Sequence, residues 1–175
     1  DRESSIWINR ISTPLGSMIM GVHDNGLCLL EFAERRMLDT QLKRLRQRMG
    51  RVFLPGDHPL MKQVNQELDD NFEGSLRKFT VPLQAPGTEF QEAVWAALRE
   101  IPYGAMRSYA DVAGKIGHIG AERAVGRANG DNRIAIIIPC HRVVGSDGEL
   151  TGYGGGLWRK EFLLAMEQAQ AFHLT

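Results

Sequence analysis

Residues 134–138 form an unbroken apolar stretch, Ile-Ala-Ile-Ile-Ile, which is followed directly by Pro139, Cys140 and His141. Four β-branched residues in five positions predict a fully buried strand. Because Pro139 has no N–H to donate to a strand ladder, we expect the strand to end there. The chain must therefore fold around a buried segment that presents a cysteine and a histidine from a rigid support.

The Cys140–His141 pair predicts a nucleophilic thiol. The thiolate is the reactive form, and a pKa of about 8.5 requires a nearby base or cation for reactivity near neutrality. His141 and Arg142 are candidates for that role. Adjacent strand residues point to opposite faces, so Cys140 and His141 can meet only if the chain turns after Pro139, or through a water. Inert packing of a buried cysteine is the alternative.

The composition narrows the class of protein. The 175 residues include 21 basic and 21 acidic ones, so attraction of the whole chain to phosphate cannot by itself provide high affinity for nucleic acid. No apolar run approaches the roughly 18 residues that span a bilayer, and residues 1–5 lack the pattern of a signal peptide. Two cysteines without metal-ligand spacing fit a reducing compartment. We expect a cytoplasmic location, no membrane partner, no metal and no cofactor.

Residues 35–51 hold seven basic residues and one acid, interleaved with leucine and methionine. This pattern predicts an amphipathic helix. A solvated basic face over an apolar stripe is the favoured interpretation of the cluster, and binding to a partner is the alternative.

The N-terminal half reads as a small α/β domain. Residues 6–32 are predicted to form short strands, with a turn at 23–26 where Asn-Gly favours a hairpin. Helices are expected at about 35–49 and at 59–73, and a strand at 79–83. Proline and glycine at 84–87 mark the domain boundary, where a new helix begins at once with a predicted Thr88–Gln91 capping box.

Residues 108–130 have the dimensions of a helix-turn-helix, with a short helix from Tyr109 and a second one from Ala121. The second helix carries Ala121, Ala124, Gly126 and Ala128. Such small residues let a helix approach a surface closely, whereas a major-groove recognition helix needs long polar side chains. Packing of small residues against another helix is the alternative interpretation.

The C-terminal half resembles the O6-alkylguanine-DNA alkyltransferase family, also called methylated-DNA–protein-cysteine methyltransferases. The resemblance covers essentially all of residues 86–175, and residues 13–16 and 26–27 resemble the family more loosely. The matching motifs are Gly87-Thr88-Glu89-Phe90-Gln91, Ile101-Pro102-Tyr103-Gly104, Arg123-Ala124-Val125-Gly126, Pro139-Cys140-His141-Arg142-Val143 and Gly152-Tyr153-Gly154-Gly155-Gly156.

The resemblance implies the chemistry of the site. Cys140 would attack the alkyl carbon of O6-alkylguanine, and of O4-alkylthymine as a second substrate, in a single irreversible transfer to the protein. His141 would act as base through a water, and Glu167 would orient His141. Asn132 would brace the turn that holds the cysteine, and Tyr109 would donate to the leaving base.

The resemblance also implies how DNA is held. The second helix would lie in the minor groove of double-stranded DNA, and the damaged nucleotide would leave the stack to reach Cys140. The implied DNA contacts are Arg123, which fills the vacated space, with Tyr109, Ala121, Ala124, Gly126 and Ser146. The implied substrate pocket contains Val143, Ser146, Tyr153, Gly154, Gly155 and Lys160. We expect a monomer, and cooperative binding along DNA remains open.

Three positions depart from the family pattern: Ile119 in the turn, Glu122 in the second helix and Asp131 after it. Two of them add negative charge beside the implied DNA face, so we expect modest DNA affinity. A thiol hydrolase and a non-catalytic winged-helix regulator are the rival functions; turnover would identify the first, and lack of covalent labelling the second. We predict an α/β N-terminal domain over residues 1–85, then a mostly α, winged helix-turn-helix-like C-terminal domain over residues 86–175.

Overall fold

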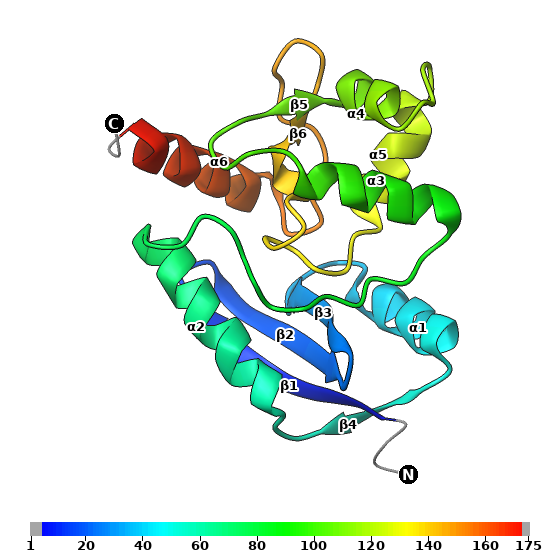
Figure 1. Ribbon diagram of the computed structural model, residues 1–175, viewed down its shortest axis with the longest axis vertical. Coiled ribbons are helices and arrows are strands. Elements are labelled where there is room, and N and C mark those ends of the chain that lie inside the picture. The colour runs from blue at the N-terminus through cyan, green and yellow to red at the C-terminus, as the bar shows by residue number, and fades with distance from the viewer. Residues whose placement is uncertain (1–4, 173–175) are drawn as a thin grey trace. The chain divides into compact units, whose positions relative to one another are not determined.

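A computed structural model describes residues 5–172 of the chain, in two compact units. The first unit ends at Pro86 and the second begins at Gly87, and the predicted domains divide between residues 85 and 86. Figure 1 shows a sheet with helices in the first unit and mostly helices in the second, as the predicted fold class requires.

The first unit is built on a four-stranded sheet in the order β3-β2-β1-β4. The strands are β1 (Ser5–Thr13), β2 (Gly16–His23), β3 (Gly26–Phe32) and β4 (Val52–Pro55). The first three form an antiparallel meander, with the predicted Asn-Gly turn between β2 and β3, and β4 pairs parallel to β1. Sequence reasoning missed β4, because this edge strand is short and its side chains are mostly exposed, so no alternation marks it.

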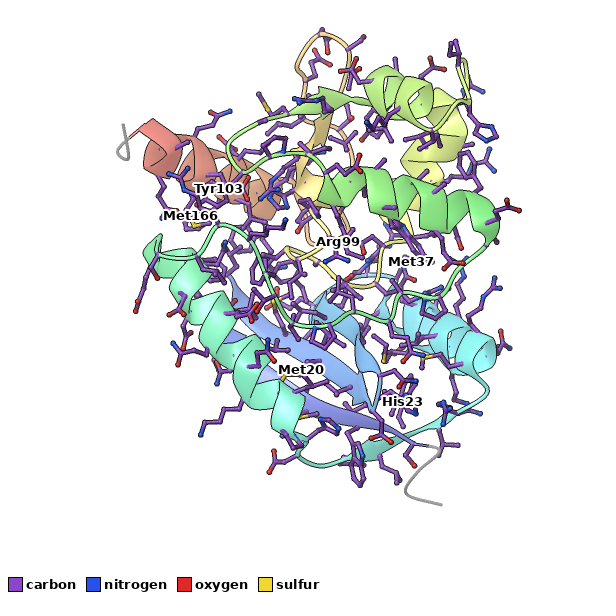
Figure 2. The ribbon with its side chains drawn as sticks, in the orientation of Figure 1. Met20, His23, Met37, Arg99, Tyr103 and Met166 are labelled. Atoms are coloured by element: carbon purple, nitrogen blue, oxygen red, sulfur yellow. The ribbon has the colours of Figure 1, made fainter. Side chains whose placement is uncertain are left out.

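Two helices accompany the sheet, α1 (Leu38–Met49) and α2 (Pro59–Glu73). The predicted bounds of α2 are confirmed, and α1 begins three residues later than predicted. Leu45 of α1 packs in a core cluster with Ile6 and Leu29 of the sheet. Helix α2 packs against β1 and β2, and Figure 2 shows Met20 of β2 beside α2.

The predicted strand at residues 79–83 is wrong: this segment bends at Val81, and only Leu83 makes a bridge, to Leu27. A buried carboxylate takes the place of a strand partner. The Glu67 side chain accepts hydrogen bonds from the backbone N–H groups of Thr80 at 2.6 Å and Val81 at 3.2 Å, and from the Thr80 hydroxyl at 2.7 Å. The backbone N–H groups of Thr80 and Val81 are therefore satisfied without the hydrogen bonds of a neighbouring strand.

The second unit contains α3 (Glu89–Arg99), β5 (Arg107–Ser108), α4 (Tyr109–Lys115), α5 (Glu122–Gly130), a 3-10 turn η2 (Cys140–Arg142), β6 (Val143–Val144) and α6 (Leu157–Phe172). Both hydrogen bonds of the Thr88–Gln91 capping box are present at the start of α3, as predicted. The two short strands pair parallel to each other. The Trp95 indole of α3 donates to the Ala128 carbonyl of α5 at 2.8 Å and so ties the helix-turn-helix to α3.

We predict that Glu67→Ala will lower the free energy of unfolding of the first unit by about 1–3 kcal/mol, because it leaves the backbone N–H groups of Thr80 and of the buried Val81 without their carboxylate acceptor. Urea denaturation at neutral pH measures the effect. Asp69→Ala, an exposed carboxylate on the same helix, is the matched control and should change stability by less than about 0.5 kcal/mol. Equal destabilisation by both changes would contradict a bracing role for Glu67.

Candidate active site

The predicted strand at residues 134–138 is wrong, although the segment is fully buried. The chain forms tight turns there, with the Ile138 N–H donating to the Ile134 carbonyl at 3.0 Å and the Ile137 N–H to the Ala135 carbonyl at 2.8 Å. Ile136 has a φ of 71°, in the left-handed region that a β-branched residue rarely adopts. The isoleucines therefore indicate burial and not an extended backbone.

Asn132 explains why the turns are stable. Its side-chain oxygen accepts from the Ile134 N–H at 3.0 Å, and its amide nitrogen donates to the Ile134 carbonyl at 3.3 Å and the Ile138 carbonyl at 2.9 Å. One buried side chain thus satisfies backbone groups that a neighbouring strand would otherwise serve. This is the bracing position that the family resemblance implies for Asn132.

Cys140 begins η2, so the chain does turn after Pro139. Cys140 is a buried residue. The backbone carbonyl of Cys140 accepts hydrogen bonds from the Val143 N–H and from the side-chain amide of Asn129, the latter at 3.3 Å. The family motif includes Asn129, but the sequence assigns it no role, because an asparagine near the end of a helix has many alternative roles. The turn places His141 next to Cys140 on a compact, fully buried support.

His141 and Glu167 form a buried pair. The His141 Nε2 atom lies 2.8 Å from the Glu167 Oε2 atom, and both side chains are almost completely inaccessible. Glu167 lies on α6, which packs against η2. The other ring nitrogen of His141, Nδ1, has no hydrogen-bond partner within residues 5–172.

Arg142 completes this network. Its guanidinium donates to both Glu167 oxygens, at 2.8 and 3.0 Å, and to the Ile101 carbonyl at 2.7 Å. Sequence reasoning considered Arg142 only as a cation for the thiol, since nothing in the sequence predicts its distant carboxylate partner. A two-pronged arginine fixes the carboxylate in one orientation and so fixes the histidine. Tyr103, labelled in Figure 2, lies in the segment after α3, beside α6. The Tyr103 hydroxyl donates a hydrogen bond to the Gln170 side chain of α6.

The electrostatics of the pair fix the protonation of the imidazole. Burial alone would raise the pKa of Glu167, but hydrogen bonds and charge from His141 and Arg142 lower it to about 2. Burial lowers the pKa of His141, and this effect outweighs the opposing influence of Glu167. An ionised Glu167 can only accept, so a neutral His141 donates from Nε2 and keeps a basic lone pair on Nδ1.

Thr151 connects the glycine-rich loop to two site residues. Its carbonyl accepts from the Tyr109 hydroxyl at 3.1 Å and from the Lys160 ammonium at 2.9 Å. Lys160 is completely buried and donates also to the Gly152 carbonyl at 3.2 Å. Burial lowers the pKa of Lys160, and charge on Cys140 opposes that shift. Thr151 has no sequence signal, because it acts through its backbone.

The remaining pocket residues surround this loop. Val143 is fully buried in β6, where it pairs with Arg107 of β5. Gly155 is buried and its carbonyl accepts from the Arg159 guanidinium at 2.9 Å, whereas Gly154 is exposed and Tyr153 is half-buried. Two buried side chains of the first turn of α6 therefore hold the loop backbone: Lys160 at residues 151 and 152, and Arg159 at Gly155.

The implied DNA contacts divide between α5 and the loop. Arg123 is exposed in the first turn of α5, after Ala121 at its N-cap. Ala124 and Gly126 are partly exposed, and the Tyr109 ring lies against Gly126, where an added Cβ would be 3.8 Å from the ring. Ser146 is exposed in the turn after β6. The structure thus places the Tyr109 ring beside Gly126, and keeps Arg123 accessible.

The three departures from the family pattern differ in their surroundings. Ile119 is almost fully exposed in the turn between α4 and α5, and Glu122 is exposed at the first residue of α5. Asp131 is only partly exposed, and its carboxylate accepts from the Gln91 amide at 3.1 Å. Its charge is engaged by the capping residue of α3, so Glu122 is the more accessible acid of the two.

Within residues 5–172, no three side chains of histidine, cysteine, aspartate or glutamate gather where they could hold a metal ion. His23 and Cys28, a histidine and a cysteine of the first unit, are both buried. Among the same residues, no helix has the length and apolar character needed to cross a bilayer.

Comparison with known proteins extends over nearly the whole chain. Residues 89–169 match the model of the 6-O-methylguanine DNA methyltransferase DNA-binding domain. The methylated-DNA–protein-cysteine methyltransferase of Mycobacterium tuberculosis is 45% identical over 95% of this chain and 94% of its own length. The chain belongs to the methylated-DNA–protein-cysteine methyltransferase family.

Other members of this methyltransferase family agree with the match. The methyltransferase of Methanosarcina barkeri is 42% identical over 93% of this chain and 98% of its own length. A crystal structure of Mycobacterium tuberculosis OGT in complex with DNA superposes with a TM-score of 0.80 and 41% identity, over 95% of this chain and 94% of that one. The methyltransferase of Pyrococcus kodakaraensis, at 24% identity and a TM-score of 0.68 over 93% of this chain and 98% of that one, shares the fold.

The buried His141–Glu167–Arg142 network predicts an acid-sensitive stability. The folded-state pKa of Glu167 is lowered from 4.5 to about 2, so its contribution is complete above pH 4.5 and is lost as the pH falls toward 2. We expect Glu167→Gln to cost about 3–5 kcal/mol at pH 7, because it leaves the Arg142 charge buried without its anion, and to cost less at pH 3.

Urea denaturation across this pH range tests the expectation. Glu100→Gln, which removes an exposed carboxylate in a surface ion pair with Lys115, is the matched control and should cost no more than about 1 kcal/mol at either pH. A Glu167→Gln penalty that does not change between pH 7 and pH 3 would rule out an ionised Glu167.

Proposed function

We propose that this protein repairs alkylated DNA by moving the alkyl group from O6 of guanine to its own Cys140. The observation that carries the proposal is the joining, in one unit, of a cysteine turn braced by Asn132 and a buried His141–Glu167 pair beside a helix-turn-helix. Membership of the methyltransferase family supports the reaction, and the relative bound to DNA supports DNA as the partner. O4-alkylthymine is the second substrate that the proposal includes.

The proposed transfer is a single displacement. The thiol proton of Cys140 passes through a water to the basic Nδ1 of His141, while Glu167 holds the opposite ring nitrogen. The Cys140 sulfur then forms a bond to the alkyl carbon as the bond from that carbon to O6 breaks. The guanine leaves with the electron pair and takes up one proton, which balances the proton that His141 removed from the thiol, and the Tyr109 hydroxyl donates a hydrogen bond to the leaving base. The thioether is stable, so each molecule reacts once.

The reaction requires the nucleotide to leave the base stack, because O6 of guanine takes part in pairing inside the duplex. We propose that α5 lies in the minor groove, with Ala121, Ala124 and Gly126 allowing a close approach. Arg123, which is exposed, fills the space of the extruded base, and Ser146 contacts the base or a neighbouring phosphate. Val143, Tyr153, Gly154, Gly155 and Lys160 form or support the pocket that receives the base.

Intact mass spectrometry tests the transfer. Incubation with a duplex that contains one O6-methylguanine should add about 14 Da once per molecule, and Cys140→Ser should add nothing. Peptide mapping should place the group on residue 140 and leave Cys28, the buried cysteine of the first unit, unmodified. Repeated turnover, or specific lesion binding without any mass gain, would replace this proposal by a hydrolase or by a recognition protein respectively.

The exposed carboxylate of Glu122 predicts a modest DNA affinity. We expect Glu122→Ala to tighten binding to a lesion-containing duplex by about two- to fivefold at low salt, with a smaller effect at higher salt, because it removes like-charge repulsion. Fluorescence anisotropy measures the affinity. Glu89→Ala changes the corresponding first residue of α3 and should leave affinity unchanged. Equal affinities of the wild type and Glu122→Ala at matched salt would refute the repulsion.

A further inference from the structure

The basic cluster of the first unit lies on α1 and in the residues before it, and nothing in the proposed transfer uses it. Its exposed cations, here called the α1 basic surface, are Arg36, Lys43, Arg44, Arg46 and Arg48. Asp39 is the single acidic residue between positions 35 and 51. The surface is thus a concentrated positive charge on a chain whose formal charge is zero.

These cations are held on a rigid support. The opposite face of α1 is packed into the first unit through the buried Leu45 and Gln41, with Leu42 and Met49 partly buried beside them. Cations on a packed helix lose less freedom on binding than cations on a mobile loop. The backbone that carries the α1 basic surface is therefore already fixed before a ligand binds.

The cations have few protein partners. Arg35, just before the helix, is paired with the buried Glu31. By contrast, the side chains of Arg36, Lys43, Arg46 and Arg48 make no hydrogen bond or ion pair within residues 5–172. Their charge is therefore not used to hold the fold, and Asp39 is the one acidic residue on this helix.

A groove of about 410 Å³ runs along the same helix. Its lining combines the Lys43 and Arg46 side chains with the apolar Leu42 and Phe53, together with Asp39 and Gln47. Phe53 comes from β4, so the groove joins the helix to the sheet edge. A sugar–phosphate backbone offers partners for both kinds of side chain, because its anionic phosphates are separated by sugars.

We propose that the α1 basic surface is a second contact for the backbone of duplex DNA, which binds it without regard to sequence. The second unit, from residue 87 onward, contains ten acidic and nine basic residues, so it offers no net attraction to phosphate. The α1 basic surface supplies that attraction. An anionic membrane fits less well, because a membrane-binding helix inserts an apolar face, and that face of α1 is buried in the core.

The test compares two triple variants in binding to a fluorescent 20-base-pair duplex without a lesion. The first, Lys43→Gln, Arg46→Gln and Arg48→Gln, neutralises the α1 basic surface with residues that favour helices. The matched control, Arg10→Gln, Lys62→Gln and Lys78→Gln, removes the same charge from other exposed positions of the first unit. Circular dichroism and thermal melting establish that both variants are folded.

We expect the surface variant to bind at least tenfold more weakly at low salt. The slope of log affinity against log salt should fall by about two to three, since each lost phosphate contact removes about 0.9 from it. The control should keep the slope of the wild type. Equal slopes for the two variants would overturn the proposal, and so would a surface variant that loses binding to phosphatidylserine vesicles but keeps binding to the duplex.

Methyl transfer from the free base O6-methylguanine to Cys140, measured by intact mass, separates this proposal from the proposed repair function. The free base carries no phosphate, so the surface variant should react at the rate of the wild type. If the wild type shows no methyl transfer, the result counts against the repair function alone. If the surface variant keeps the salt slope of the wild type, the result counts against the α1 basic surface alone.

Discussion

The Glu167 carboxylate is the interaction on which the site depends. It is almost completely buried and accepts from the His141 imidazole and twice from the Arg142 guanidinium. Both donors belong to η2, the turn that begins at Cys140, so one carboxylate on α6 fixes the backbone on the far side of the nucleophile. A buried charge of this kind is tolerated only when its partners are complete, which makes the network all-or-none.

Asn132 provides the corresponding constraint on the near side. Its amide group binds backbone atoms at both ends of the turns that lead into Pro139. Cys140 thus lies between two braced segments. Asn132 bonds the backbone before it, as a neighbouring strand would, and Glu167 bonds the side chains of His141 and Arg142 after it. Neither partner is close to Cys140 in sequence, with Glu167 on α6 and Asn132 eight positions earlier, so only the folded unit positions the thiol.

The sequence predicts these elements unevenly, for physical reasons. The meander, α2 and the start of α3 follow local rules, since hydrophobic periodicity and the capping box act over a few residues. The segments 79–83 and 134–138 were predicted as strands and are not, because Glu67 and Asn132 satisfy their backbone groups from a side chain. A run of β-branched residues reports burial, and only a hydrogen-bonding partner decides between a strand and a turn.

The site residues divide in the same way. The resemblance singled out His141, Glu167, Asn132, Tyr109 and Lys160, and the structure gives each of them defined hydrogen-bond partners. Their functions remain proposals. By contrast, the Asn129 side-chain amide donates to the Cys140 carbonyl, and Thr151 acts through its own backbone carbonyl. No pattern in the sequence marks such roles.

The Thr151 carbonyl has a consequence for how the loop meets a ligand. A carbonyl oxygen has two lone pairs, and Tyr109 and Lys160 occupy both. Any group that draws the Tyr109 hydroxyl away releases one of them, whereas Lys160, held inside the unit, keeps the other. The Thr151 carbonyl therefore accepts from a ligand only while Tyr109 is engaged elsewhere, so the availability of this oxygen depends on a contact made by a different helix.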